Sequence, residues 1–89
     1  NSIMEKIFEE IKNERKKQDE KWGEQNHRPI IWTSILGEEY GEVCKEALES
    51  NFEMDDVSFR LRLENYRREC IQVAAVAVAM IECLERNKC

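Results

Sequence analysis

Hydrophobic side chains recur at helical spacing along three stretches of the chain, and two stretches without such a period separate them. Residues three and four positions apart lie on one face of a helix, so each stretch predicts an amphipathic helix. Ser2, followed by Glu5 three residues later, fits an N-terminal cap, and Pro29 suits a first helical turn. The pattern predicts an all-α fold whose three helices span about residues 2–17, 29–50 and 57–86.

The third predicted helix has two halves of different character. In the first, which is basic and amphipathic, Phe59, Leu61 and Leu63 alternate rather than follow a helical period, and this would fit an early break. The second, from Val73 to Ile81, is apolar on every face and must therefore be covered on every face. Two short partner helices cannot do this. We expect a four-helix-bundle-like core in an obligate oligomer, a homodimer or alternatively a tetramer.

Composition and charge narrow the class of protein. With three glycines, one proline and no internal repeat, the 89 residues form one helical domain over residues 1–89. A chain this short buries only about 60% of its unfolded surface, which also favours oligomerisation. The formal charge of −5 argues against a nucleic-acid-binding protein that relies on a basic surface. The apolar run of residues 73–81 is too short to span a membrane.

The cysteines lack the spacing of a metal or redox motif. No C-x-x-C pair occurs and no histidine pair lies near them, and three of the four fall within helical patterns as small apolar residues. We predict reduced thiols in a cytoplasmic protein, with a zinc site or a disulfide as the less favoured alternative, for Cys44, Cys70, Cys83 and Cys89.

The segment between the first two predicted helices, residues 18–29, has no apolar period but contains a tryptophan, the only histidine and several long polar side chains. Two interpretations remain open. Trp22 would stack on a ligand base, with Lys21 and Arg28 on phosphate oxygens and Gln18 or His27 on a base edge. Alternatively, Trp22 plugs the open end of a helix bundle while the charged groups stay solvated.

Three carboxylates, Glu38, Glu39 and Glu42, occur within five residues of the second predicted helix. Their i, i+3 and i, i+4 spacings place them over one patch, where like charges repel by a few tenths of a kcal/mol per pair. Glu69 and Gln72 form a similar pair on the third helix, which antiparallel packing would bring to the first three. Oxygen ligands from two helices suit Mg²⁺ or Mn²⁺ better than zinc. The alternative is a solvated acidic face.

These residues also resemble a known family. The pattern Glu-Glu-x-x-Glu at residues 38–42, then 26 residues, then Glu-x-x-Gln at 69–72 is similar to the Glu-Glu-x-x-Glu and Glu-x-x-Asp motifs of all-α nucleoside triphosphate pyrophosphohydrolases. The strings at residues 14–23 and 71–77 look like those of short phage and bacterial MazG-like proteins. The resemblance covers about residues 14–80.

The resemblance implies a function and a set of residues. The chain would convert an NTP or dNTP to the monophosphate and pyrophosphate, with Mg²⁺, or Mn²⁺ in its place, as cofactor. Glu39, Glu42 and Glu69 would bind the metal with Gln72 in the fourth position, and Glu38 would hold a second ion or orient the attacking water. Our candidates for substrate contacts are Gln18, Lys21, Trp22, Arg62 and Arg68.

One departure from the family supports a second hypothesis. Gln72 stands where the family has aspartate, so the site loses one negative charge and its attraction for Mg²⁺ is weaker. The alternative function is a non-catalytic helical dimer that binds nucleotide or a protein partner. A third interpretation is a structural module in which the glutamates pair with Arg67, Arg68 or lysines. The sequence identifies neither the base nor the sugar.

Overall fold

The computed structural model describes residues 2–89, so Asn1, the first residue of the predicted domain, lies outside the described residues. Its three helices are α1 (Ile3–Trp22), α2 (Pro29–Ser50) and α3 (Asp56–Glu85). No strand occurs within residues 2–89. The all-α prediction is confirmed.

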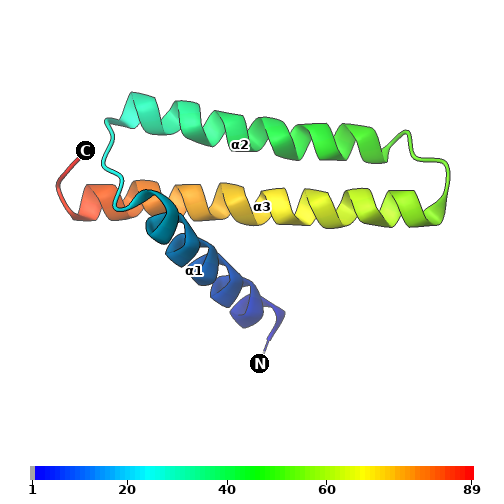
Figure 1. Cartoon of the computed structure of the whole chain (residues 1–89), viewed down its shortest axis with the longest axis horizontal. Helices are drawn as coiled ribbons and strands as arrows, with labels where there is room; N and C mark the ends of the chain where they lie inside the picture. The colour runs from blue at the N-terminus through cyan, green and yellow to red at the C-terminus, as the bar shows by residue number, and fades with distance from the viewer. Residues whose placement is uncertain (1) are drawn as a thin grey trace.

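Two of the helices form a long antiparallel hairpin, and the third diverges from it. Figure 1 shows α2 and α3 side by side along their length, joined by a turn at residues 51–55. The α1 helix begins away from the hairpin at Ile3 and approaches the second half of α3 toward its C-terminal end (Figure 1). Packing therefore joins α3 to both other helices, whereas α1 and α2 do not pack against each other.

The helix starts follow the expected capping chemistry. The Ser2 hydroxyl accepts a hydrogen bond from the Glu5 backbone N–H at 3.1 Å, and the Asp55 carboxylate accepts one from the Ser58 N–H at 2.8 Å. Pro29 occupies the first position of α2, where its missing N–H costs nothing. These caps confirm the predicted starts of α1 and α2.

The first helix is longer than the sequence pattern predicts, because it continues to Trp22 instead of ending near residue 17. The Arg15 guanidinium binds the side chains of Gln18 and Asp19 at 2.9 Å each, three and four residues later. Such pairs stabilise a helix that lacks an apolar period. Gly23, with φ of 75°, then ends the helix in a conformation that favours glycine. The prediction of a loop over residues 18–22 was wrong.

The third helix is long, as predicted, and it runs unbroken through the segment where an early break was the open alternative. Phe59, Leu61 and Leu63 are 40%, 54% and 41% exposed, so none of them belongs to a buried face in this chain. Their alternation therefore carries no information about the local backbone, which keeps its helical hydrogen bonds.

The core lies between α2 and the second half of α3. Trp32 is 2% exposed and packs with the buried Val76, Ala79 and Cys83. The opposite side of α3 is not covered in the same way, because Val78 remains 37% exposed. The alanine-rich half is therefore buried mainly on one side within the chain. No helix of residues 2–89 has the length and hydrophobicity needed to cross a membrane.

Two of the four cysteines form a disulfide bond, so the prediction of four reduced thiols was wrong. The chain turns back after α3, where the Lys88 N–H donates to the Cys83 carbonyl at 3.3 Å. This turn brings Cys89 to Cys83, with their Cα atoms 5.7 Å apart. The free thiols are Cys44 and Cys70.

Candidate functional site

A cavity of about 270 Å³ lies where the end of α1, the first half of α2 and the middle of α3 come together, and we call it the Trp22 cavity. Five of the residues predicted to bind metal or substrate line it. They come from all three helices. The lining residues are Gln18, Trp22, Gln25, Trp32, Ile35, Glu38, Glu39, Gln72, Val76 and Ala79.

Glu39, at the wall of this cavity, has a carboxyl pKa above the ordinary glutamate value. Partial burial raises the pKa of its carboxyl group, and the nearby charges of Glu69, Glu42, Glu38 and Glu14 raise it further, in that order. No positively charged side chain among residues 2–89 forms an ion pair with Glu39. Glu42 and Glu69 do not line the cavity, but their negative charges raise the pKa of Glu39, which does.

The donor chemistry of this cluster fits a hard divalent cation. Four carboxylates and one amide oxygen, from Glu38, Glu39, Glu42, Glu69 and Gln72, are the ligand types that Mg²⁺ prefers. In residues 2–89, however, no three carboxylate, imidazole or thiol groups are gathered closely enough to hold a metal ion. Metal binding would therefore require the glutamate side chains to change rotamer and converge.

A hydrogen-bonded chain orients two of the three glutamines of the cavity, Gln18 and Gln72. Arg15 donates to Glu82 on α3 at 2.6 Å and to the Gln18 amide oxygen at 2.9 Å. The Gln18 amide nitrogen in turn donates to the Gln72 oxygen at 3.4 Å. Because this oxygen already accepts a hydrogen bond, Gln72 would be a weaker metal ligand than a free carboxylate.

The Trp22 ring is available to a ligand. It is 57% exposed, and the Lys21 ammonium lies over it, 4.7 Å from the ring centroid. Within the single chain Trp22 is not part of the core, and the buried Trp32 is the tryptophan that fills it.

The loop before α2 is fixed to the end of α3. The Arg86 guanidinium donates to the Gln25 carbonyl at 3.1 Å and to the Asn26 side-chain oxygen at 3.0 Å, and pairs with Glu24 at 3.4 Å. These contacts hold Gln25 at the cavity wall. Gln25 is a site residue that the sequence interpretation missed, and its place in a polar, tryptophan-containing segment was the available signal.

Two buried nitrogens near the cavity have no protein partner. The His27 and Trp32 rings meet edge to face, with centroids 4.8 Å apart and planes at 79°. Neither His27 Nε2 nor Trp32 Nε1 has a hydrogen-bond partner among residues 2–89. Buried polar atoms without a partner are costly, so these two nitrogens lower the stability gained by packing the rings together.

Three predicted substrate-contacting cations lie outside the Trp22 cavity. Arg62 is held at the far end of the hairpin by Glu46, Glu49 and Glu53, at 3.4, 2.6 and 3.1 Å. Lys21 lies over the Trp22 ring and does not line the cavity. Arg68 lines a neighbouring pocket.

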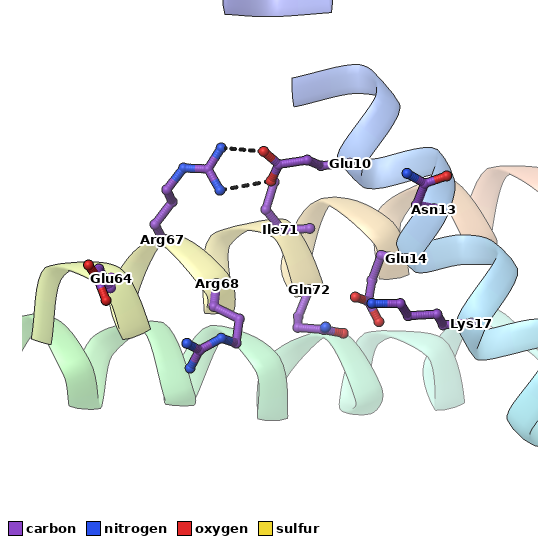
Figure 2. Close-up of a pocket in the computed structure, with 9 residues that line it drawn as sticks. All are labelled: Glu10, Asn13, Glu14, Lys17, Glu64, Arg67, Arg68, Ile71 and Gln72. Atoms are coloured by element: carbon purple, nitrogen blue, oxygen red, sulfur yellow. Dashed lines mark hydrogen bonds and ion pairs between the residues drawn. The ribbon is translucent and has the colours of Figure 1, made fainter. Parts of the chain in front are cut away.

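That neighbouring pocket, of about 430 Å³, lies between α1 and α3, and we call it the α1–α3 pocket (Figure 2). Gln72 lines both this pocket and the Trp22 cavity. The walls of the α1–α3 pocket are mostly charged, and they include a bidentate ion pair between Arg67 and Glu10 at 2.7 and 2.8 Å. The lining residues are Glu10, Asn13, Glu14, Lys17, Glu64, Arg67, Arg68, Ile71 and Gln72.

No protein-family model, no curated protein and no solved structure matches this chain.

Proposed function

We propose that the chain is a magnesium-dependent nucleoside triphosphate pyrophosphohydrolase, with the Trp22 cavity as its active site. The observation that carries this proposal is the environment of Glu39. Its carboxyl group lines a cavity that also contains Trp22, and four further carboxylates raise its pKa without any compensating cation. A site that combines unneutralised acidic oxygens with an exposed aromatic ring suits a metal-bound nucleotide. Metal-dependent release of pyrophosphate from nucleoside triphosphates tests the proposal.

The acidic residues would hold the metal and the attacking water. Glu39, Glu42 and Glu69 would hold Mg²⁺ with Gln72, and when bound the ion would neutralise charge on the phosphate oxygens. Glu38, at the cavity wall, would orient a water molecule. The water oxygen would form a bond to the α-phosphorus while the bond to the bridging oxygen breaks. That oxygen would leave with pyrophosphate, and the proton of the water would pass through Glu38 to solvent.

The other end of the cavity would bind the nucleoside. Trp22 would stack on the base, since more than half of the residue is exposed. The side-chain amides of Gln18 and Gln25 line the same cavity and offer both donors and acceptors to a base edge. Arg15 and Arg86 would act as positioning residues, because each fixes one of these glutamines.

The identity of residue 72 favours one alternative function, a nucleotide-binding dimer without turnover. We expect Gln72→Asp to raise Mg²⁺ affinity about tenfold or more, because it adds a negative charge to the proposed ligand set. Isothermal titration with Mg²⁺ and a turnover assay measure the two effects separately. Turnover that appears only in Gln72→Asp would establish the non-catalytic alternative. Equal Mg²⁺ affinity in both proteins would remove residue 72 from the ligand set.

We also propose that the chain forms a homodimer through the uncovered side of α3. Ile81 is 57% exposed, and Val78 lines two adjacent pockets, one of them shared with Phe8 and Ile11 of α1. An apolar surface of this kind is typical of a subunit interface.

A negative charge introduced on the uncovered side of α3 is expected to raise the dissociation constant of the dimer at least about tenfold, which corresponds to about 1.4 kcal/mol. The variant is Ile81→Glu, and sedimentation equilibrium measures the dissociation constant. Met54→Glu is the matched control, since Met54 is 98% exposed and lies in the turn before α3. A wild-type monomer, or equal dissociation constants for the two variants, would contradict the assignment of this face.

A further inference from the structure

The Trp22 cavity and the α1–α3 pocket are adjoining parts of one surface. Gln72 lines both. Glu14, which lines the α1–α3 pocket, also contributes to the raised pKa of Glu39 in the Trp22 cavity, so the two carboxylates are near each other. An elongated ligand could therefore run from Trp22 past the acidic cluster into the α1–α3 pocket.

The cations of the α1–α3 pocket are not equivalent. Arg67 is neutralised by its bidentate pair with Glu10 (Figure 2). Lys17 and Arg68 have no ion-pair partner among residues 2–89, although Arg68 donates one hydrogen bond to Asn65 at 2.9 Å. They come from different helices, α1 and α3, and line the same pocket. Two cations without carboxylate partners on opposite walls favour an anionic ligand.

We propose that the α1–α3 pocket receives the pyrophosphate moiety of the nucleotide, bound by Lys17 and Arg68, while the base lies against Trp22 on the other side of Gln72. This inference rests on the proposed function. Trp22, the acidic cluster and the pair Lys17 and Arg68 would contact the base, the metal-bound α-phosphate and the β,γ-phosphates of a nucleoside triphosphate, respectively. Lys17 is thereby assigned a role in binding the β,γ-phosphates, which its position in the sequence alone does not indicate.

The acidic residues of the α1–α3 pocket bear on whether pyrophosphate binds free or as its magnesium complex. Glu14 and Glu64 also line it, and their charges oppose those of Lys17 and Arg68. Free pyrophosphate would be repelled by these carboxylates, whereas its magnesium complex carries less negative charge. The pocket would therefore bind the magnesium complex of pyrophosphate more tightly than free pyrophosphate.

The direct test is calorimetric titration of inorganic pyrophosphate into the full chain, in excess Mg²⁺ and separately in EDTA. We expect binding in Mg²⁺ and little in EDTA, and at least about tenfold weaker binding in Lys17→Gln and in Arg68→Gln, since each loses a charge-assisted contact. Lys16→Gln and Arg60→Gln are matched controls. They remove the same charges from exposed positions of α1 and α3 that line neither pocket, and we expect less than a twofold change.

The outcomes separate this inference from the proposed function. If the wild-type protein binds no magnesium pyrophosphate, or if the pocket variants match their controls, the pyrophosphate subsite is wrong even where turnover is observed. If pyrophosphate binds in a manner that depends on Lys17 and Arg68 but no nucleotide is hydrolysed, the subsite stands and the proposed catalytic activity fails. A third readout supports the subsite: nucleoside monophosphate should bind both variants as tightly as the wild type, because it lacks the β- and γ-phosphates.

Discussion

Replacement of Glu39 by glutamine is expected to lower magnesium-dependent release of pyrophosphate by at least about 100-fold. A bound metal ion contributes several kcal/mol of charge stabilisation, and about 1.4 kcal/mol corresponds to a tenfold change in rate. Glutamine keeps the shape of the side chain but removes the charge that would hold Mg²⁺ at the cavity wall. Glu42→Gln should have an effect of the same kind, because Glu42 belongs to the same acidic cluster.

The same substitution is expected to stabilise the metal-free protein at neutral pH. The pKa of Glu39 is raised in the folded state, so the folded chain binds this proton more tightly than the unfolded chain does. Ionised Glu39 therefore costs stability. The cost is absent below the ordinary glutamate pKa of about 4.3 and grows as the pH rises through the raised folded-state value. Removing the charge should add about 0.5 kcal/mol at pH 7 in EDTA and nothing in acid.

Urea denaturation at two pH values, together with the turnover assay, separates a site residue from a structural one. Glu9→Gln is the control, since it removes a charge from an exposed position of α1 that lines neither pocket. Loss of turnover with a gain in stability is the expected combination for Glu39. Loss of both would make Glu39 a structural residue, and unchanged turnover would remove it from the active site.

Trp32→Ala is expected to destabilise the fold by about 3–5 kcal/mol. Trp32 is 2% exposed and is the largest member of a core that otherwise contains Val76, Ala79 and Cys83. Its removal would leave a cavity between α2 and α3. The free energy of unfolding of a native protein is only about 5–15 kcal/mol in total. We therefore expect a substantial fraction of the Trp32→Ala molecules to be unfolded at 37 °C.

The second tryptophan provides a matched comparison for this prediction. Trp22 is 57% exposed, so Trp22→Ala should change the free energy of unfolding by no more than about 0.5 kcal/mol. Trp22→Ala should instead weaken nucleotide binding. The expected loss is about 1–3 kcal/mol, the contribution of stacking one base on an aromatic side chain. Circular dichroism with urea denaturation measures the stability of both variants. A Trp32→Ala protein as stable as the wild type would contradict the assignment of the core.

Local chemistry made most of the fold predictable. The Ser2 cap and the Pro29 start depend on neighbouring residues only, and both were predicted. The extension of α1 to Trp22 was not predicted, because the prediction relied on apolar periodicity and did not use the i, i+4 spacing of Arg15 and Asp19. The return of Cys89 to Cys83 depends on a backbone turn after α3, which residue spacing does not show.

The candidate site was predictable where one helix or one helix pair determines it. Glu38 and Glu39 share a turn of α2, and antiparallel packing brings Gln72 of α3 to them. The approach of α1 was not predictable, because its angle to α3 depends on tertiary contacts such as Arg15 with Glu82. Arg62 shows the same limit: three carboxylates hold it at the far end of the hairpin, and a basic helix segment gives no sign of those partners.

The most direct test of the central claim is pyrophosphate release from a panel of canonical and modified NTPs and dNTPs, with Mg²⁺ or Mn²⁺ and with EDTA as control. The account predicts release that requires the metal, that is lost in Glu39→Gln and that favours some bases over others through Trp22. No release from any nucleotide by a folded helical protein, or release that persists in EDTA or in Glu39→Gln, would contradict it.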